Sequence, residues 1–313
     1  MPPEPWRGVG RLLAVRLDNI GDIVMVGPAL RALRRALPGA KITLWASPTG
    51  SLVAPMLPWI DDVIVHRVVW QDASGALPLD PDRERALIAA LRARRFDAAV
   101  IFTSFSQSPY PPAYACYLAG IPIRLGQSKE FGGSLLTQWV RPKSDGLHQV
   151  DRNLHLLEAA GFSLAGRQLE LHVSPEVQEA ADRQVRALGI NPARPFLVLA
   201  PGASCPARRY DLARFLEVAR RLEAESGLPM VVIGSAREAD LLAPIVEEAP
   251  VASLVGRISV PEMAAVLRRA RLVIANDSGP MHVADAFGRP MVILYSGTEL
   301  EEQWRPRGSP ARL

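Results

Sequence analysis

Blocks of apolar and polar positions alternate along the chain and predict strands and helices in turn. In the first block, an apolar run that begins at Arg11 reaches a polar turn at Asp18–Asp22. Apolar residues then recur at helical spacing until Pro38-Gly39. This pattern predicts a strand, a tight turn and a helix. Repeated strand and helix pairs are typical of a parallel sheet covered on both faces.

The alternation continues through the first half of the chain. We expect strands at Lys41–Ser47, Asp62–Val69, Asp97–Thr103, Ile121–Gly126 and Gln168–Val173, and helices at 80–95, Tyr110–Ala119 and Asp151–Ala160. The stretch Gln127–Gly146 contains glycines and mixed charge without clear periodicity. We interpret it as a long loop, which is either functional or a surface excursion.

A second series follows a helix at Pro175–Leu188 and a hinge at 191–195. We expect strands at Phe196–Ala200, Met230–Ile233, Val251–Val255, Arg271–Ala275 and, as the last one, Pro290–Tyr295. Helices are expected at Leu212–Ser226, Arg237–Glu248, Ser259–Arg269 and Pro280–Phe287, and the spacing of Ser259 and Glu262 matches a capping box. The sequence predicts two similar α/β halves, with a boundary between residues 173 and 174.

Composition limits the class of protein. A chain of 313 residues that is 49% hydrophobic can bury a large core and is long enough for two domains. The net charge of +4 comes from scattered arginines, which indicate solvated helix faces or attraction to anionic ligands or a phosphate-bearing membrane surface. Two cysteines, Cys116 and Cys205, form neither a disulfide framework nor a metal motif, so a reducing compartment is expected.

Two stretches of the sequence bear on targeting and membrane insertion. The first ten residues, MPPEPWRGVG, lack the apolar core of a signal peptide. The uncharged stretch 98–123 is interrupted by Pro109, Pro111 and Pro112, which argue against a membrane-spanning helix. We therefore expect a cytoplasmic protein.

The turn at Asp18–Asp22 is the first candidate for chemistry. In an α/β protein such a turn lies at the carboxyl end of a strand, where ligands of open parallel sheets bind. Gly21 would allow a sharp turn, and Asp22 would begin the helix. The simpler interpretation is that Asp22 caps the helix, which stabilises it by about 1 kcal/mol.

Two turns of the second half are candidates for anion binding. Pro201–Tyr210 combines a glycine turn with Arg208 and Arg209, whose planar donors fit phosphate oxygens, although it could equally be a solvated surface loop. Asn276–His282 follows an apolar run and places Pro280 in the first helical turn. Free N–H groups there would bind an anion, or the segment is a capped helix with a structural His282.

Two further turns give weaker signals. Glu238 could hold a ribose hydroxyl, but a helix-start charge is the simpler interpretation. The turn Gly256–Ile258 could line a base pocket with backbone atoms. The sequence has no Walker A loop, no complete G-x-G-x-x-G and no His/Cys metal cluster, which argues against P-loop, dinucleotide and zinc sites.

Taken in order, three motifs resemble glycosyltransferase family 9, the lipopolysaccharide heptosyltransferases and their relatives. They are the GD turn followed by GPALRALRRALP, the PGAS…RRY loop, and NDSGPMHVADAFGRPMVILYSGT. The resemblance extends over nearly the whole chain. It implies a GT-B fold, with two Rossmann-like, doubly wound parallel-sheet domains facing across a cleft. The acceptor would bind mostly to residues 1–173 and the nucleotide sugar mostly to residues 174–313.

The resemblance also implies an activity. It predicts an inverting, metal-independent transfer of heptose from ADP-heptose to a lipopolysaccharide-core-like glycolipid or glycan, without a cofactor or a nucleic-acid partner. The protein would work in the cytoplasm, in peripheral contact with the inner membrane. Asp22 falls on the general base, with Asn19 and Gly21 on the acceptor side. The donor-side residues would be Ser204, Arg208, Glu238, Gly256, Arg257, Ile258, Asp277, Ser278, Gly279 and His282.

Two features depart from the family pattern. Arg208 stands where a phosphate-binding lysine is usual, which keeps the charge but changes its geometry. The sequence ends at Leu313, where the resemblance implies a further C-terminal helix. Two alternatives therefore remain: a non-catalytic nucleotide or sugar-phosphate binding protein of the same fold, and a GT-B nucleotide-sugar epimerase.

Overall fold

The chain folds into two compact units, each built on its own parallel sheet. The computed structural model describes residues 2–72 and 74–313. Unit 1 comprises Met1–Arg167 and unit 2 comprises Gln168–Leu313. The division therefore falls between residues 167 and 168 rather than between 173 and 174.

Unit 1 contains a six-stranded sheet in the order β3-β2-β1-β4-β5-β6, with every neighbouring pair parallel. The strands are β1 (Arg11–Arg16), β2 (Lys41–Ala46), β3 (Asp62–Val65), β4 (Ala98–Ile101), β5 (Ile123–Gln127) and β6 (Gln138–Val140). The helices are α1 (Ile20–Ala36), α2 (Pro81–Ala93), α3 (Tyr110–Leu118) and α4 (Gln149–Ala159).

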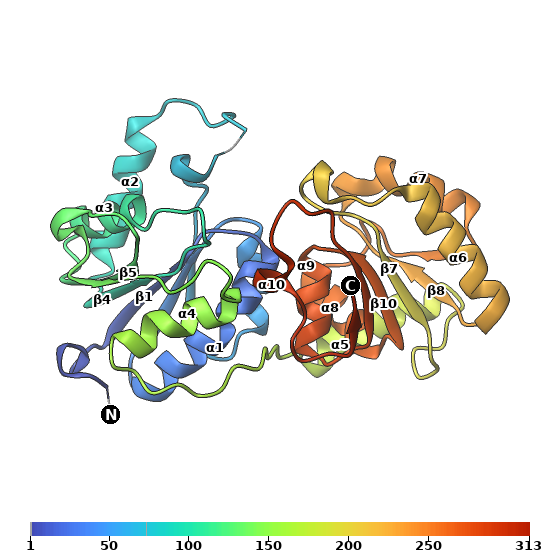
Figure 1. The fold of residues 1–313 in the computed structure, drawn as a ribbon, viewed down its shortest axis with the longest axis horizontal. Coiled ribbons are helices and arrows are strands. Elements are labelled where there is room, and N and C mark those ends of the chain that lie inside the picture. Colours follow the sequence, from blue (N-terminus) through green and yellow to red (C-terminus); the bar gives the residue numbers. More distant parts are fainter. Residues whose placement is uncertain (1, 73) are drawn as a thin grey trace. The chain divides into compact units, whose positions relative to one another are not determined.

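The two faces of this sheet are covered by different helix pairs. Leu13 and Val15 of β1 lie in a core cluster with Leu91 of α2 and Cys116 of α3. Helices α1 and α4 pack against each other over the opposite face (Figure 1). Because side chains alternate along a strand, Arg16 belongs to the α1 and α4 face. This alternation directs the guanidinium toward the start of α1.

Unit 2 contains a second six-stranded parallel sheet, in the order β12-β11-β10-β7-β8-β9. The strands are β7 (Leu197–Ala200), β8 (Met230–Val232), β9 (Ala252–Ser253), β10 (Leu272–Asn276), β11 (Met291–Leu294) and β12 (Ala311–Arg312). The helices are α5 (Pro175–Ala187), α6 (Leu212–Ser226), α7 (Ala239–Glu248), α8 (Val260–Arg269), α9 (Gly279–Ala286) and α10 (Glu301–Trp304).

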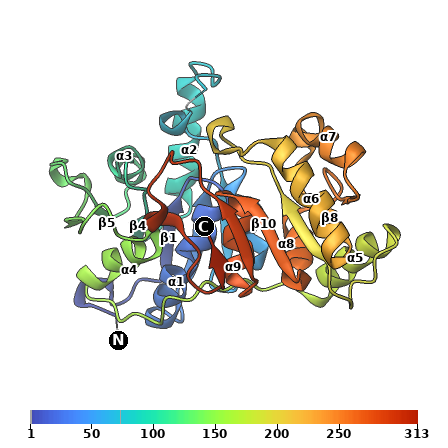
Figure 2. The same ribbon diagram turned by 45° about the vertical axis from the view of Figure 1, so that its right-hand side comes forward.

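Helices again cover both faces. Phe215 of α6 and Ile245 of α7 pack on Leu199 and Val232 of the sheet, while α5, α8 and α9 pack side by side (Figure 2). The capping box expected at the start of α8 is confirmed. The Glu262 carboxylate accepts a hydrogen bond of 2.8 Å from the backbone N–H of Ser259, whose hydroxyl accepts one of 3.3 Å from the Glu262 N–H.

Both sheets have the strand order 3-2-1-4-5-6 when the strands are numbered within their own unit. This is the order of a Rossmann sheet, in which the chain reverses its direction of travel across the sheet at one point. The reversal lies between β1 and β4 in unit 1, and between β7 and β10 in unit 2. Ligands of open α/β sheets bind beside the carboxyl ends of strands at this point.

Four predictions about elements were wrong. Residues 168–173 contain no strand, and the supposed loop 127–146 contains the edge strand β6. β12 follows the strand expected to be the last. The hinge expected at 191–195 lies inside unit 2. β6 and β12 have three and two residues and pair on one side only. Such short edge strands depend on a neighbouring strand rather than on their own apolar pattern.

Within the residues that the structure describes, no helix combines the length and apolar composition needed to cross a bilayer.

Replacement of Phe215 by Ala should destabilise unit 2, because Phe215 is 1% exposed in the centre of its core cluster. We expect the free energy of unfolding to fall by about 3–5 kcal/mol, measured by urea denaturation. Val218→Ala, on the same helix and 37% exposed, is the matched control and should lower it by about 0.5 kcal/mol or less. Equal effects of the two substitutions would contradict this packing.

Candidate functional site

Asp22 lies at the switch point of unit 1, in the first turn of α1. Its Oδ2 accepts a hydrogen bond of 3.3 Å from the backbone N–H of Asn19, the N-cap residue. Asn19 rather than Asp22 is thus the N-cap residue, and Asp22 takes part in capping as the third residue of a capping box. Gly21 lies inside α1 and is buried, so the chain turns before Gly21 rather than at it.

A buried arginine holds this aspartate. Arg16, at the end of β1, is 0% exposed, and its Nη2 donates to Asp22 Oδ1 at 2.5 Å and to Ser104 Oγ at 2.7 Å. The Nε of the same guanidinium lies 2.8 Å from Oδ2 of Asp18. The side-chain amide of Gln107 donates to the other oxygen of Asp18. One guanidinium thus binds two carboxylates that follow β1 and a hydroxyl that follows β4.

A second arginine, Arg152, lies close enough to Arg16 for their charges to interact. Arg152 of α4 donates from Nε to the Thr103 carbonyl at 3.3 Å, and its guanidinium lies 4.9 Å from the centre of the Phe105 ring. Burial lowers the pKa of Arg152 to about 10, and the positive charge of Arg16 adds to the shift. Burial raises the pKa of Asp18, against the opposing charge of Arg16. The cluster is therefore a partly desolvated network of charges.

In unit 2, a buried asparagine joins the two turns that flank the switch point. Asn276, the last residue of β10, is 0% exposed. Its Nδ2 donates to the Pro201 carbonyl at 2.6 Å, and its Oδ1 accepts from the Tyr210 N–H at 3.2 Å. Both ends of the Pro201–Tyr210 turn are thereby fixed to the end of β10. The two turns expected to bind anions do lie together.

The arginines of this turn have different partners. Arg209 donates from Nε to the Ala203 carbonyl at 2.8 Å, which stabilises the turn itself. Arg208 is about one quarter exposed and forms an ion pair with Glu299, which follows β11. Ser204, on the same turn, is exposed. Arg208 thus presents its charge at the carboxyl edge of the sheet.

The segment Asn276–His282 begins α9 at this edge. Ser278 is the extended N-cap residue, its hydroxyl donates to the Asn276 carbonyl at 3.2 Å, and α9 begins at Gly279. Asp277 and His282 are both 5% exposed. Burial raises the pKa of Tyr295, and the negative charge of Asp277 contributes. The first N–H groups of α9 are directed toward this edge, as an anion site requires.

Glu238 belongs to a capping box, as the simpler interpretation held. Its Oε2 accepts from the Ser235 N–H at 2.8 Å and from the Ser235 hydroxyl at 2.7 Å. The carboxylate also lies so close to Gly202 that any Cβ there would collide with it. Glu238 is therefore an acidic residue at the start of a helix, and its carboxylate also lies against Gly202 in the Pro201–Tyr210 turn.

The remaining donor-side residues lie at the next turn. Gly256 has φ +68°, a left-handed conformation that favours glycine, and its N–H donates to the Gly234 carbonyl at 3.0 Å. Arg257 is exposed and Ile258 is partly buried beside it. This bond joins the 234–238 and 256–258 turns at the carboxyl edge of the sheet.

Sequence reasoning placed Asp18 and Asn276 within candidate turns without giving either a role, and it missed four other side chains that hold these sites together: Arg16, Ser104, Gln107 and Glu299. One signal was available. A charged residue at the end of an otherwise apolar strand, such as Arg16, must find a partner when it is buried. The partners in the 104–107 loop carried no such signal, because only the sheet order places that loop beside β1.

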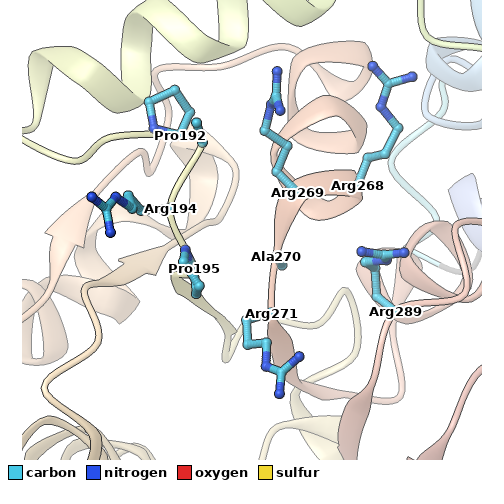
Figure 3. Close-up of a pocket in the computed structure, with 9 residues that line it drawn as sticks. Pro192, Arg194, Pro195, Arg268, Arg269, Ala270, Arg271 and Arg289 are labelled. Carbon is cyan, nitrogen blue, oxygen red and sulfur yellow. The ribbon is translucent and has the colours of Figure 1, made fainter.

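A pocket of about 470 Å³ lies at the opposite, amino-terminal edge of the unit 2 sheet (Figure 3). Its arginines do not converge: Arg269 is bound to Asp182 and Arg268 to Gln178, both on α5, and Figure 3 shows Arg194 and Arg271 directed elsewhere. This pocket is therefore separate from the site described above. Within residues 2–72 and 74–313, no group of three His, Cys, Asp or Glu side chains could hold a metal ion.

Known proteins resemble this chain in sequence and in fold. The lipopolysaccharide heptosyltransferase 2 of Escherichia coli strain K12 is 26% identical over 297 residues, which cover 91% of this chain and 82% of that protein. A solved family 9 glycosyl transferase from Veillonella parvula DSM 2008 superposes with a TM-score of 0.80 at 24% identity, over 97% of this chain and 85% of that one.

The solved ADP-heptose lipopolysaccharide heptosyltransferase II of Escherichia coli superposes with a TM-score of 0.77 at 24% identity, over 96% of this chain and 89% of that one. These superpositions show that the fold is GT-B. The model of glycosyltransferase family 9 (heptosyltransferase) matches residues 84–311. The chain belongs to glycosyltransferase family 9.

Proposed function

We propose that this glycosyltransferase transfers a heptose from ADP-heptose to a lipopolysaccharide-core-like glycan, with inversion at the anomeric carbon and with Asp22 as general base. The observation that carries the proposal is the placement of Asp22, fixed by Arg16 at the carboxyl edge of β1. The names of the relatives, which include an ADP-heptose lipopolysaccharide heptosyltransferase, support the choice of donor and acceptor.

The donor diphosphate would bind at the switch point of unit 2. As the sugar leaves, negative charge develops on the diphosphate oxygens, and fixed donors aimed at them lower the barrier. Arg208 supplies a full positive charge at this edge, and the first turn of α9 supplies N–H groups with the favourable end of the helix dipole. These groups could do the work often done by a divalent cation, so we propose a metal-independent reaction.

Asp22 would take the proton of the attacking hydroxyl. The acceptor oxygen forms the new bond to the anomeric carbon, its proton passes to Asp22, and ADP leaves with the electrons of the broken bond. Oδ1 of Asp22 is bound to Arg16, whereas Oδ2 accepts a long hydrogen bond of 3.3 Å from the Asn19 N–H. Oδ2 is therefore the oxygen assigned to the proton.

The acceptor defines the proposed location. A lipopolysaccharide-core-like acceptor is anchored to a membrane by its lipid, so we propose that the protein works in the cytoplasm in peripheral contact with the inner membrane. The scattered arginines would favour an anionic membrane surface.

Asp22→Asn should abolish transfer and leave nucleotide binding nearly unchanged, because the amide keeps the shape but cannot take a proton. We expect a rate loss of roughly 10²–10⁴-fold, measured as glycan product formed from ADP-heptose. Calorimetric titration with ADP is the control for intact folding. Transfer at the wild-type rate would refute the assignment of the base. Donor turnover without acceptor would instead indicate an epimerase.

Arg208→Met should weaken binding of ADP, because a charged hydrogen bond to phosphate is lost. We expect a rise in the ADP Kd of about 10- to 100-fold, from the usual strength of such bonds. Glu299→Gln is the matched variant with the opposite effect: it removes the carboxylate that competes with phosphate for Arg208 and should tighten ADP binding. An unchanged Kd in both variants would exclude Arg208 from the donor site.

Transfer should persist when divalent cations are removed. We expect the wild-type rate in excess EDTA to equal the rate with added Mg²⁺, because Arg208 and the α9 N–H groups would meet the leaving charge. The measurement is product formation after dialysis against chelator. Loss of activity that returns with Mg²⁺ would show that the reaction needs a metal.

A further inference from the structure

Asp18 is the part of the unit 1 cluster that the proposed reaction does not yet use. Its side chain is 11% exposed, close to the 16% of Asp22, and both carboxylates are bound to Arg16. The three polar groups that fix Asp18 come from three segments. They are the Arg16 guanidinium on β1, the Gln107 amide after β4, and the Ser47 hydroxyl, which donates to the Asp18 carbonyl at 2.5 Å.

The position of Asp18 is also sterically defined. A Cβ at Gly50 would lie 2.6 Å from the Asp18 carbonyl oxygen and 2.9 Å from the Ile23 side chain. The 47–50 segment therefore packs directly on the backbone between β1 and α1, and only glycine allows this approach. Asp18 is therefore fixed through both its side chain and its backbone, although a simple helix cap would not need it.

The charges explain why a second carboxylate matters. Arg16 has no exposed surface, so its positive charge is compensated by the two carboxylates that it contacts, Asp22 and Asp18. Arg152 adds a second positive charge close to Arg16. Asp18 is thus the second carboxylate of the cluster, and the charge of Arg16 opposes the effect of burial on its pKa.

We propose that Asp18 is a positioning residue of the transfer reaction, which shares the Arg16 guanidinium with Asp22 and so keeps Asp22 oriented without fully neutralising its charge. This inference rests on the proposed role of Asp22 as general base. The charged groups beside Asp22 are Arg16 on β1 and Asp18 after it, and Arg152 on α4, whose own charge is opposed by Asp145, interacts with Arg16. Ser104 and Gln107 after β4 are uncharged.

The test is the pH profile of kcat/KM in Asp18→Asn. Transfer requires an ionised base, so protonation of the cluster at acidic pH should abolish activity. Without the Asp18 charge, the Arg16 guanidinium is paired with the carboxylate of Asp22 alone. We expect the acidic limb to move to lower pH by about one unit or more, from the usual effect of a neighbouring charge. The plateau rate should fall by roughly tenfold as the base weakens.

Ser104→Ala is the matched control, because it removes an uncharged partner of the same Arg16 Nη2. The acidic limb of the Ser104→Ala pH profile should stay at the wild-type pH. A merely structural role for Asp18 would lower the plateau without moving the limb, and that result would overturn the proposal. If Asp18→Asn does not fold, Asp18→Ser removes the same charge and is expected to give the same shift.

Asp22→Asn, measured beside these variants, separates the two ideas. If Asp22→Asn is inactive and the acidic limb of Asp18→Asn stays at the wild-type pH, the proposed role of Asp18 is refuted and that of Asp22 is not. An Asp22→Asn variant as active as the wild type refutes the base on which the inference depends.

Discussion

A guanidinium buried away from water must be paired, and at Arg16 this requirement organises the candidate site of unit 1. Breaking a buried ion pair by removing one partner costs about 3–5 kcal/mol, so the partners of Arg16 are held in place. Those partners come from the turn after β1, the first turn of α1 and the loop after β4. Residues separated by more than eighty positions in sequence thus meet around one side chain.

In unit 2 an uncharged residue, Asn276, joins the segments of the candidate site as Arg16 does in unit 1. Asn276 at the end of β10 has both a donor and an acceptor, and it uses them to fix the two ends of the Pro201–Tyr210 turn. Asn276 brings no charge of its own, and at this edge the positive charge of Arg208 is paired with Glu299. The two edges therefore differ: Arg208 is partly exposed and paired with one carboxylate, whereas Arg16 is buried and paired with two.

Capping and the proposed catalysis make different demands on Asp22. A carboxylate that closes a capping box is rigid and well oriented, whereas a general base must also take up a proton. Orientation is provided by the Asn19 N–H and by Arg16, and Asp18 is a second carboxylate bound to the same guanidinium. The segment from Arg16 to Asp22 therefore contains the proposed base and the groups that orient it.

The sequence by itself determined the fold class, most element positions, the capping box at Ser259, and the turns at which polar residues gather. These follow from local patterns: apolar periodicity, turn residues and helix caps depend on neighbours in the chain. The short strands β6 and β12 could not be predicted from the sequence. Two or three residues are too few to show an alternating apolar pattern, and they pair only when a neighbouring strand is present. Only the tertiary structure brought Ser104 and Gln107 to Arg16 and Asp18, and Glu299 to Arg208. Those contacts depend on the order of strands in each sheet, which is decided by long-range packing rather than by any local run of residues.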